Sequence, residues 1–244
     1  MVKLLSSSTT PLLQVKRLRA WYGRAQILFD VGLQVGRGEV VALMGRNGAG
    51  KSTTFKAVMG LLDRVDAEIT FGGRDLRGLD AFQIARLGLG YVPEDRRIFT
   101  ELTVMENLEV GRRPPRDGTP SWSEEKLFRV FPNLEQMRKR PGGRMSGGEQ
   151  QMLTVARTLM GNPSLVLLDE PSEGIAPKIV DDLAGMIVEL KREGLSVLLS
   201  EQNLHFAQLV CDRAYVLEKG QVKYEGTMVE LAGNAEVTRA YLAV

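Results

Sequence analysis

The chain has 244 residues, of which 43% are hydrophobic and 25% charged, and its formal net charge at pH 7 is +2. These fractions are ordinary for a globular protein and exclude a disordered or collagen-like chain, and the balance of charges gives no electrostatic reason to expect nucleic acid. One cysteine, Cys211, and one histidine, His205, exclude a disulfide framework and a histidine-rich metal site within one chain. No apolar run approaches the roughly 18 residues of a membrane span, and no signal-peptide core is present, so we expect a cytosolic protein.

In chain order, residues 1–12 are predicted to form a flexible tail, followed by antiparallel strands at Leu13–Leu18 and Ile27–Val35. Four later runs are apolar throughout, which is typical of parallel strands buried on both faces. These runs are Val40–Met44, Leu89–Val92, Leu165–Leu168 and Val197–Leu199. A helical pattern at Lys178–Glu193 ends at Gly194. The pattern predicts an α/β fold with a mostly parallel sheet.

The stretch from about residue 79 to residue 143 interrupts this pattern with six prolines and short helical pieces such as Glu124–Phe131. We interpret residues 79–160 as a mostly helical lobe inserted into a core formed by residues 13–78 and 161–244. The alternative is one continuous core with long loops. Both interpretations predict that the chain folds around the same parallel sheet.

A glycine-rich motif lies between the strand Val40–Met44 and a predicted helix at Ser52–Leu62. It matches Gly-x-x-x-x-Gly-Lys-Ser in full and consists of Gly45, Arg46, Asn47, Gly48, Ala49, Gly50, Lys51 and Ser52, with Thr53 next. Such a loop binds a polyphosphate with its backbone N–H groups and the positive end of the helix. In this motif the lysine binds the β- and γ-phosphates and the serine hydroxyl ligates Mg²⁺. A chance glycine-rich turn would not need a strand, a loop and a helix in this order.

Two carboxylates, Asp169 and Glu170, end the apolar strand Leu165–Leu168. Asp169 is predicted to bind Mg²⁺ through a water molecule of its coordination shell, as proteins with a phosphate loop require. Successive strand residues point to opposite faces, so Glu170 is free to orient and polarise a water molecule in line with the γ-phosphate. The alternative interpretation is a solvated turn.

The segment Ser146–Gln151, with the sequence Ser-Gly-Gly-Glu-Gln-Gln, begins a helix that runs to about Met160. Ser146 and Glu149 form a capping box, which by itself indicates only a well-started helix. The glycines between them, Gly147 and Gly148, are poor helix formers and suggest a backbone that approaches a ligand closely. A helix start is also a second anion site.

The phosphate loop, this segment and the Leu-Leu-Asp-Glu-Pro strand, in this order, resemble the ATP-binding-cassette (ABC) ATPases from Trp21 to the C-terminus. The resemblance implies a phosphate-loop NTPase core with an antiparallel β subdomain and an inserted helical subdomain. It implies a head-to-tail dimer in which each ATP lies between one chain's phosphate loop and the other chain's Ser146–Gln150. It also implies that Tyr22 stacks on adenine, unless it is an ordinary core aromatic, and that Ser172–Pro177 crosses the dimer interface.

Two positions depart from most members of this family. Glu94 replaces a glutamine that contacts Mg²⁺ and the attacking water, and Gln202 replaces a histidine that contacts the γ-phosphate. Glu94 can still donate an oxygen to Mg²⁺, but it adds a negative charge near the phosphates. Gln202 can donate an amide N–H but cannot become cationic, so we expect catalysis to depend more on Glu170 and Lys51. His205 is interpreted as a helix-surface or partner-facing residue.

The Glu94 and Gln202 segments and the Ser-x-Gly-Ile-Ala-Pro loop resemble the ATP-binding subunits of branched-chain amino-acid uptake systems. A urea or short-chain amide importer is equally compatible with these residues. Glu173 departs from the branched-chain amino-acid subgroup, which usually has an apolar residue at this position. The resemblance implies transmembrane permeases as partners, a periplasmic solute-binding protein as an indirect one, and a dimer with itself or with a paired ATPase subunit.

On this resemblance the permeases dock near Glu94–Phe99 and Glu101–Leu108, on the cytoplasmic side of the inner membrane. Phe99 and Leu102 would contact a permease helix unless they are core residues of the helical lobe. The rivals are lipid-polymer export, in which the glutamine and the histidine are usually kept, and a soluble cassette protein acting on ribosomes or DNA. A phosphate-loop GTPase or kinase would not need Ser146–Gln151.

Overall fold

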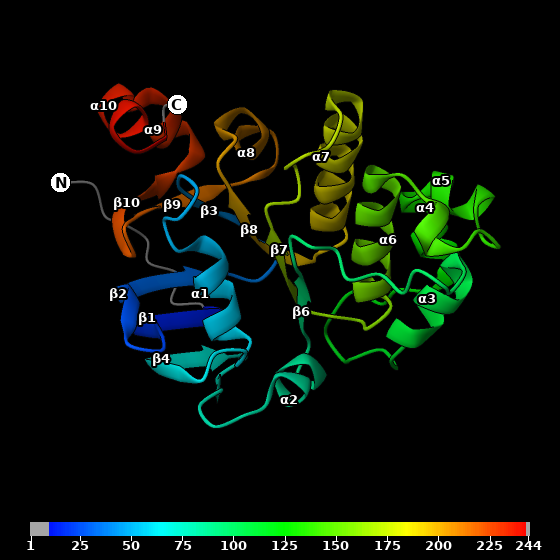
Figure 1. Ribbon diagram of the computed structural model, residues 1–244, viewed down its shortest axis with the longest axis horizontal. Coiled ribbons are helices and arrows are strands. Elements are labelled where there is room, and N and C mark those ends of the chain that lie inside the picture. The colour runs from blue at the N-terminus through cyan, green and yellow to red at the C-terminus, as the bar shows by residue number, and fades with distance from the viewer. Residues whose placement is uncertain (1–9, 243–244) are drawn as a thin grey trace.

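The computed structural model describes residues 10–242, which form two sheets with helices between and beside them (Figure 1). The smaller sheet is antiparallel and has the strand order β2-β1-β4-β5. Its strands are β1 (Leu13–Tyr22), β2 (Ala25–Val35), β4 (Arg64–Phe71) and β5 (Arg74–Asp75). The predicted antiparallel start of the fold is therefore confirmed.

The larger sheet has six strands in the order β10-β9-β3-β8-β7-β6, and all neighbours pair in parallel except β10 with β9. Its strands are β3 (Val40–Met44), β6 (Leu89–Val92), β7 (Leu165–Asp169), β8 (Ser196–Glu201), β9 (Arg213–Glu218) and β10 (Gln221–Thr227). Every residue of β3, β7 and β8 is buried. Burial on both faces explains why these strands are apolar runs without alternation.

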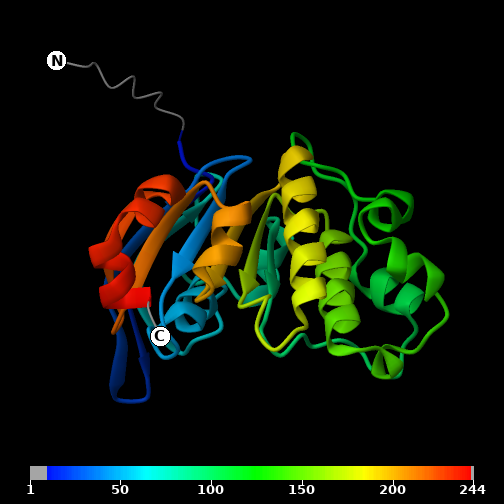
Figure 2. The ribbon, with the colours of Figure 1, turned by 90° about the horizontal axis from the view of Figure 1, so that it is seen from above.

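The helices divide between the two faces of the larger sheet. They are α1 (Lys51–Val58), α2 (Ala81–Arg86), α3 (Val104–Gly111), α4 (Glu124–Val130), α5 (Pro132–Gln136), α6 (Gly147–Leu159), α7 (Pro177–Arg192), α8 (Leu204–Val210), α9 (Met228–Gly233) and α10 (Ala235–Val237). Phe55 of α1 packs with residues of both sheets, so α1 lies between them. Leu153 of α6 and Ile187 of α7 pack with Val40 on the opposite face. Figure 2 shows α6 and α7 side by side there.

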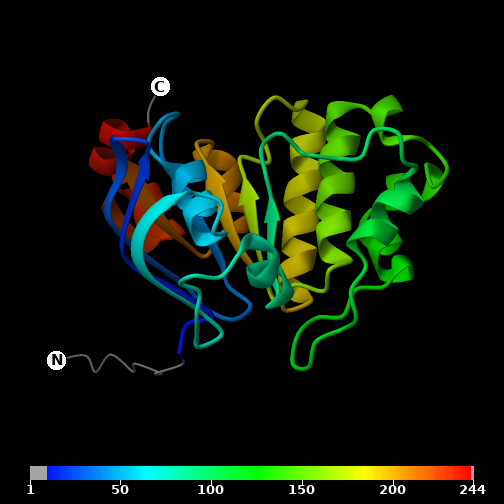
Figure 3. The same ribbon diagram turned by 60° about the horizontal axis from the view of Figure 1, so that its bottom comes forward.

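The region predicted as an inserted helical lobe, residues 79–160, has a different boundary in the structure. Its strand β6 pairs with β7 and is an edge strand of the larger sheet, so the prediction that the lobe begins at residue 79 is wrong. The helices α3, α4 and α5 form an outer layer beyond α6 (Figure 3). Apolar residues of these helices belong to the same buried cluster as one face of the sheet, and α6 contacts both α3 and β6.

Two further features concern the ends of the chain and the membrane. Residues 1–9 of the predicted tail lie outside the described residues, whereas Leu12 is buried and its amide donates to the carbonyl of Val35 at 2.8 Å. The predicted tail of residues 1–12 is therefore too long. Between residues 10 and 242, no helix combines the length and the apolar character that crossing a membrane requires.

Candidate functional site

The phosphate loop leaves the end of β3 and leads directly into α1, as predicted. Gly50 precedes the helix with a φ of 110°, a left-handed backbone that favours glycine. Lys51, the first residue of α1, is only 3% exposed. Its Nζ donates to the carbonyl oxygens of Gly45 at 2.7 Å and Arg46 at 3.1 Å. The ammonium group is therefore held inside the curve of the loop, where a phosphate would meet it.

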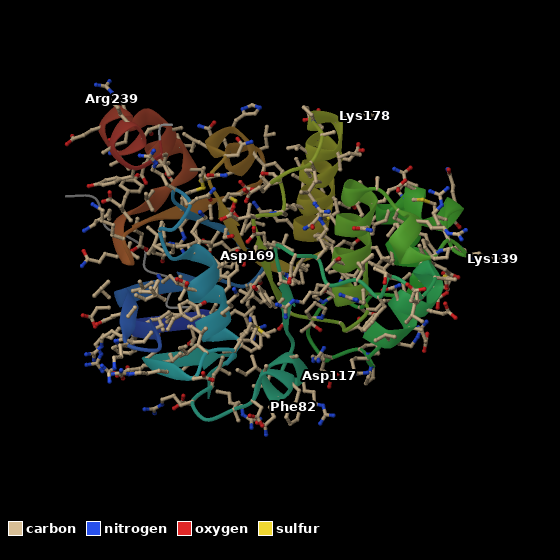
Figure 4. The ribbon with its side chains drawn as sticks, viewed as in Figure 1. Phe82, Asp117, Lys139, Asp169, Lys178 and Arg239 are labelled. Atoms are coloured by element: carbon tan, nitrogen blue, oxygen red, sulfur yellow. The ribbon has the colours of Figure 1, made fainter. Side chains whose placement is uncertain are left out.

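Asp169 lies at the carboxyl end of β7, near the centre of the molecule (Figure 4). Its Oδ1 accepts hydrogen bonds from Ser52 Oγ at 3.0 Å and from Ser200 Oγ at 2.7 Å. Its Oδ2 accepts one from the hydroxyl of Tyr91 at 3.1 Å. Burial raises the pKa of this carboxyl, and the three hydrogen bonds only partly oppose the rise.

Glu170 follows the strand with a φ of 45°, and this left-handed turn directs its side chain to Lys51. The Lys51 Nζ and Glu170 Oε1 atoms are 3.1 Å apart, and the two side chains are 2% and 8% exposed. The amide of Glu170 donates to Ser200 Oγ at 2.9 Å. Burial alone would raise the pKa of Glu170, but a hydrogen bond from Glu173 and the charge of Lys51 outweigh it and lower that pKa.

Glu173 completes a cluster of carboxyl groups around Lys51. Its hydrogen bond to Glu170, its partial burial and the charges of Glu170 and Glu94 raise the pKa of Glu173 to about 7. Glu170 Oε2 is buried and has no hydrogen-bond partner in the described residues, and the neighbouring Glu173 carboxyl, when protonated, can donate to the Glu170 side chain. The two glutamates therefore share a proton near neutral pH.

The shared proton predicts how stability changes with pH. Because the pKa of Glu173 rises from 4.5 in the unfolded chain to about 7 in the folded one, this group stabilises the fold fully below pH 4.5. That stabilisation is lost as the pH rises through 7. We expect Glu173→Gln, which keeps a neutral donor, to have a flatter free energy of unfolding between about pH 5 and about pH 8 than the parent. Urea unfolding without nucleotide measures this free energy at each pH. Parallel pH profiles of the two proteins would contradict the prediction.

Glu201, at the end of β8, organises the loops on this side of the site. Its side chain is 1% exposed. It accepts hydrogen bonds at 3.1 Å from the backbone amides of Ser172, Gln202 and Asn203. The loop predicted to cross the dimer interface is thereby joined to the segment that contains Gln202.

Gln202 lies beside the phosphate loop. It is exposed and lines a cavity of about 420 Å³. The other lining residues are Gly45, Arg46, Asn47, Asn203 and Leu242. Its neighbour His205 is exposed, which agrees with the interpretation as a surface residue.

The Ser146–Gln151 segment begins α6 with the predicted capping box. Ser146 N donates to Glu149 Oε2 at 2.7 Å, and Glu149 N donates to Ser146 Oγ at 3.4 Å. A Cβ on Gly147 would lie 2.8 Å from a guanidinium nitrogen of Arg96, and one on Gly148 would lie 2.7 Å from Ile179 Cγ2. The guanidinium end of Arg96 can move aside, so packing within the chain supplies a reason for Gly148, which the sequence interpretation did not include, and not for Gly147.

The structure does not bring this segment to its own phosphate loop. In Figures 1 and 3, β6 and β7 lie between α1 and α6. Tyr22 is 47% exposed at the end of β1, so it is not an ordinary core aromatic. Glu94 follows β6 and is exposed, near enough to Glu173 for its charge to raise the pKa of that group.

The residues present fit a magnesium nucleotide. No group of three or more His, Cys, Asp or Glu side chains that could hold a metal ion occurs within residues 10–242. Ser52 Oγ and Asp169 Oδ1, 3.0 Å apart, offer one hydroxyl and one carboxylate. Mg²⁺ is commonly bound by one or two carboxylates together with substrate phosphates, which matches this donor set. Lys51 and the start of α1 supply positive charge for those phosphates.

Sequence reasoning missed Tyr91, Ser200 and the structural role of Glu201. Tyr91 lies on β6, and Ser200 and Glu201 lie on β8. Both strands are direct neighbours of β7, and each of these polar side chains stands in or at the end of an apolar run. That contrast was the available signal, because a buried polar group requires a partner.

Known proteins with similar sequences and structures agree with this geometry. A protein-family model described as ABC transporter matches residues 28–173 of the sequence. The chain is 42% identical to the high-affinity branched-chain amino acid transport ATP-binding protein BraG of Pseudomonas aeruginosa, over 95% of this chain and 99% of BraG. It is 37% identical to the lipopolysaccharide export system ATP-binding protein LptB of Haemophilus influenzae, over 95% and 97%. A crystal structure of an ABC transporter cassette in its ADP conformation matches with a TM-score of 0.79 at 26% identity, over 95% of this chain and 98% of that one.

Proposed function

Because this chain belongs to the ABC transporter family and is an ATP-hydrolysing subunit of a transporter, we propose that it drives uptake of branched-chain or related amino acids through separate permeases. The observation that supports the solute class is the 42% identity to BraG along nearly the whole of both chains. LptB, whose name states lipopolysaccharide export, is similar at 37%. Glu94 and Gln202 replace residues that export subunits usually keep, and this favours import.

In the proposed reaction, the backbone of Gly45–Gly50 and the ammonium of Lys51 hold the phosphates of ATP. Ser52 and Asp169 hold Mg²⁺, which when bound neutralises charge on the phosphate oxygens. Glu170 accepts a hydrogen bond from the attacking water and polarises it, a general-base role. Lys51 Nζ and Glu170 Oε1 are 3.1 Å apart. A phosphate bound by Lys51 would therefore compete with Glu170 for the ammonium group and leave the carboxylate free for this role.

We propose that the other half of each nucleotide site comes from a second subunit. α6, whose N-cap is Ser146, lies on the opposite side of the larger sheet from α1 and the phosphate loop, so its start remains available to another chain. Their N–H groups and the helix dipole suit the γ-phosphate. Head-to-tail pairing would make one complete site from two incomplete anion sites. Ile179, which packs close beside Gly148, would help to hold that helix start in place.

The permease is proposed to dock in a groove between α2 on one side and α3 and α6 on the other. The groove has a volume of about 560 Å³. Its wall carries large apolar side chains that are roughly half exposed, namely Leu61 (45%), Phe82 (56%), Phe99 (46%) and Val110 (49%). A monomer seldom exposes such a group together unless another protein covers it. Phe82 projects from the edge of the molecule in Figure 4.

The docking proposal is tested by Phe82→Asp. We expect the variant to reduce amino-acid uptake about tenfold or more, because a charge in the groove opposes an apolar permease helix. The ATP hydrolysis of the purified subunit should stay unchanged, since Phe82 lies outside the nucleotide site. Val229→Asp is the matched control, because Val229 is 84% exposed on α9 and does not line the groove. Equal uptake by both variants would contradict the docking surface.

The solute is tested by uptake in the native host. Deletion of the gene should abolish high-affinity uptake of radiolabelled leucine, and the intact gene should restore it while Lys51→Ala should not. If the deletion instead abolished uptake of urea or a short-chain amide, that solute would replace the amino acid in the proposed function. A defect in lipopolysaccharide export with normal leucine uptake would favour the role that LptB's name states.

A further inference from the structure

Tyr91 occupies two sites at once. Its hydroxyl donates to Asp169 Oδ2 at 3.1 Å, and the residue also lines the groove that carries Phe82 and Phe99. Of the residues that hydrogen-bond the Asp169 side chain, Ser52 and Ser200 do not line that groove. Within residues 10–242, Tyr91 is thus the one side chain shared by the groove and the predicted metal-binding carboxylate.

The strand order explains this arrangement. β7 lies between β8 and β6, and Asp169 is the last residue of β7. Ser200 of β8 is directly opposite Asp169, and Tyr91 of β6 is opposite Leu167, two residues earlier on the same face. A long aromatic side chain is therefore required for a residue of β6 to reach Asp169. Serine or threonine at this position would be too short.

The hydrogen bonds restrain both carboxylate oxygens. Ser200 binds Oδ1 at 2.7 Å and Tyr91 binds Oδ2 at 3.1 Å, so the plane of the carboxylate is held from two sides. The hydroxyl of Ser52, which also binds Oδ1, would leave that bond on becoming a metal ligand. Tyr91 would then be one of the two remaining supports.

We propose that Tyr91 is a positioning residue that sets the affinity of the Asp169 site for Mg²⁺ and links this affinity to occupation of the groove. The proposal rests on the proposed function, since it assumes a magnesium nucleotide in the site. A side chain bound in the groove that moves the Tyr91 ring would change the hydrogen bond at Asp169 Oδ2. The orientation of the Asp169 carboxylate would change with it. Partners of metal ligands typically change metal affinity about 10- to 100-fold when they are removed.

The positioning role is tested by Tyr91→Phe in the full chain, which removes the hydroxyl and keeps the ring. Binding of a fluorescent ATP analogue is measured by titration with Mg²⁺ and again in EDTA. We expect the half-saturating Mg²⁺ concentration to rise about tenfold, with unchanged affinity in EDTA. Tyr215→Phe is the matched control, because the Tyr215 hydroxyl bonds Glu225 at 2.9 Å, away from the site. That control should shift neither value.

Two results would overturn this role. A half-saturating Mg²⁺ concentration within about twofold of the parent's would show that the hydroxyl does not support the metal site. An equal loss of affinity in EDTA would show a structural defect instead. If the parent protein itself bound no nucleotide, the proposed function would fail first, and the two failures are therefore distinguishable.

The link to the groove is tested with a label that fills it. Val110→Cys is made in a Cys211→Ala background and modified with a bulky maleimide, because Val110 is 49% exposed on the groove wall. The label should change the half-saturating Mg²⁺ concentration at least threefold in chains with Tyr91 and leave it unchanged in chains with Tyr91→Phe. No change with Tyr91 present, or an equal change in both, would overturn the link.

Discussion

Replacing Glu170 by glutamine is expected to lower the kcat of ATP hydrolysis at least 100-fold while nucleotide binding is kept. Glutamine cannot accept a proton from the attacking water, and general-base catalysis typically contributes about 10²–10⁴-fold. In the structure Glu170 also forms an ion pair with Lys51 at 3.1 Å, which ATP must displace. Removing the negative charge should therefore leave the affinity for ATP equal or higher. Phosphate release and fluorescent-nucleotide titration measure the two effects separately.

Gln202→Ala is the matched comparison for this prediction. Gln202 lines the cavity beside Gly45 and Arg46, but a neutral amide contributes one hydrogen bond and no general base. We expect a smaller loss of kcat than for Glu170→Gln. If Gln202→Ala abolished turnover as completely, the assignment of the main catalytic role to Glu170 would be wrong.

Lys51→Ala is expected to abolish ATP binding and also to destabilise the protein without nucleotide. The Lys51 and Glu170 side chains are 2% and 8% exposed, so loss of the ammonium leaves a carboxylate buried without its partner. Breaking a buried pair in this way costs about 3–5 kcal/mol. The affinity for ATP should fall at least 100-fold, because the same ammonium faces the phosphates. Urea unfolding and nucleotide titration give the two values.

The double variant Lys51→Ala, Glu170→Gln separates the two effects. A neutral glutamine removes the unpaired charge, so most of the lost stability should return while ATP binding remains absent. If the double variant were as unstable as Lys51→Ala, the instability would come from lost packing of the lysine side chain and not from the ion pair.

The sequence predicted the strands and the phosphate loop well because their signals are local. β3, β7 and β8 are buried on both faces, so β3 and the central residues of β7 and β8 appear as short apolar runs without alternation. The loop at Gly45–Ser52 is contiguous, and its conformation depends on its own glycines and on the elements next to it. The boundary of the lobe was wrong because β6 has only four residues and stands among prolines and short helices. Its membership of the sheet is decided by pairing with β7.

The contacts around Asp169 and Lys51 could be predicted only in part. The sequence identifies Asp169, Glu170 and Lys51 one by one. Their ion pair and hydrogen bonds depend on the sheet order, in which only β8 lies between β3 and β7. Tyr91 and Ser200 lie on β6 and β8, the strands before and after β7 in the chain, but the pairing register decides which of their side chains reach Asp169. The sequence suggests a ligand as the reason for both glycines of α6, whereas Ile179 already occupies the space beside Gly148.

Site-specific crosslinking between two copies of the chain tests the two-sided phosphate site most directly. Asn47→Cys and Ser146→Cys are made as separate chains in a Glu170→Gln, Cys211→Ala background, since Asn47 and Ser146 are both exposed. With Mg²⁺ and ATP, a short bis-maleimide should join the two chains when they are mixed, and should join neither chain to itself. A mixture that yields no crosslinked dimer with ATP, or as much without nucleotide as with it, would contradict the account.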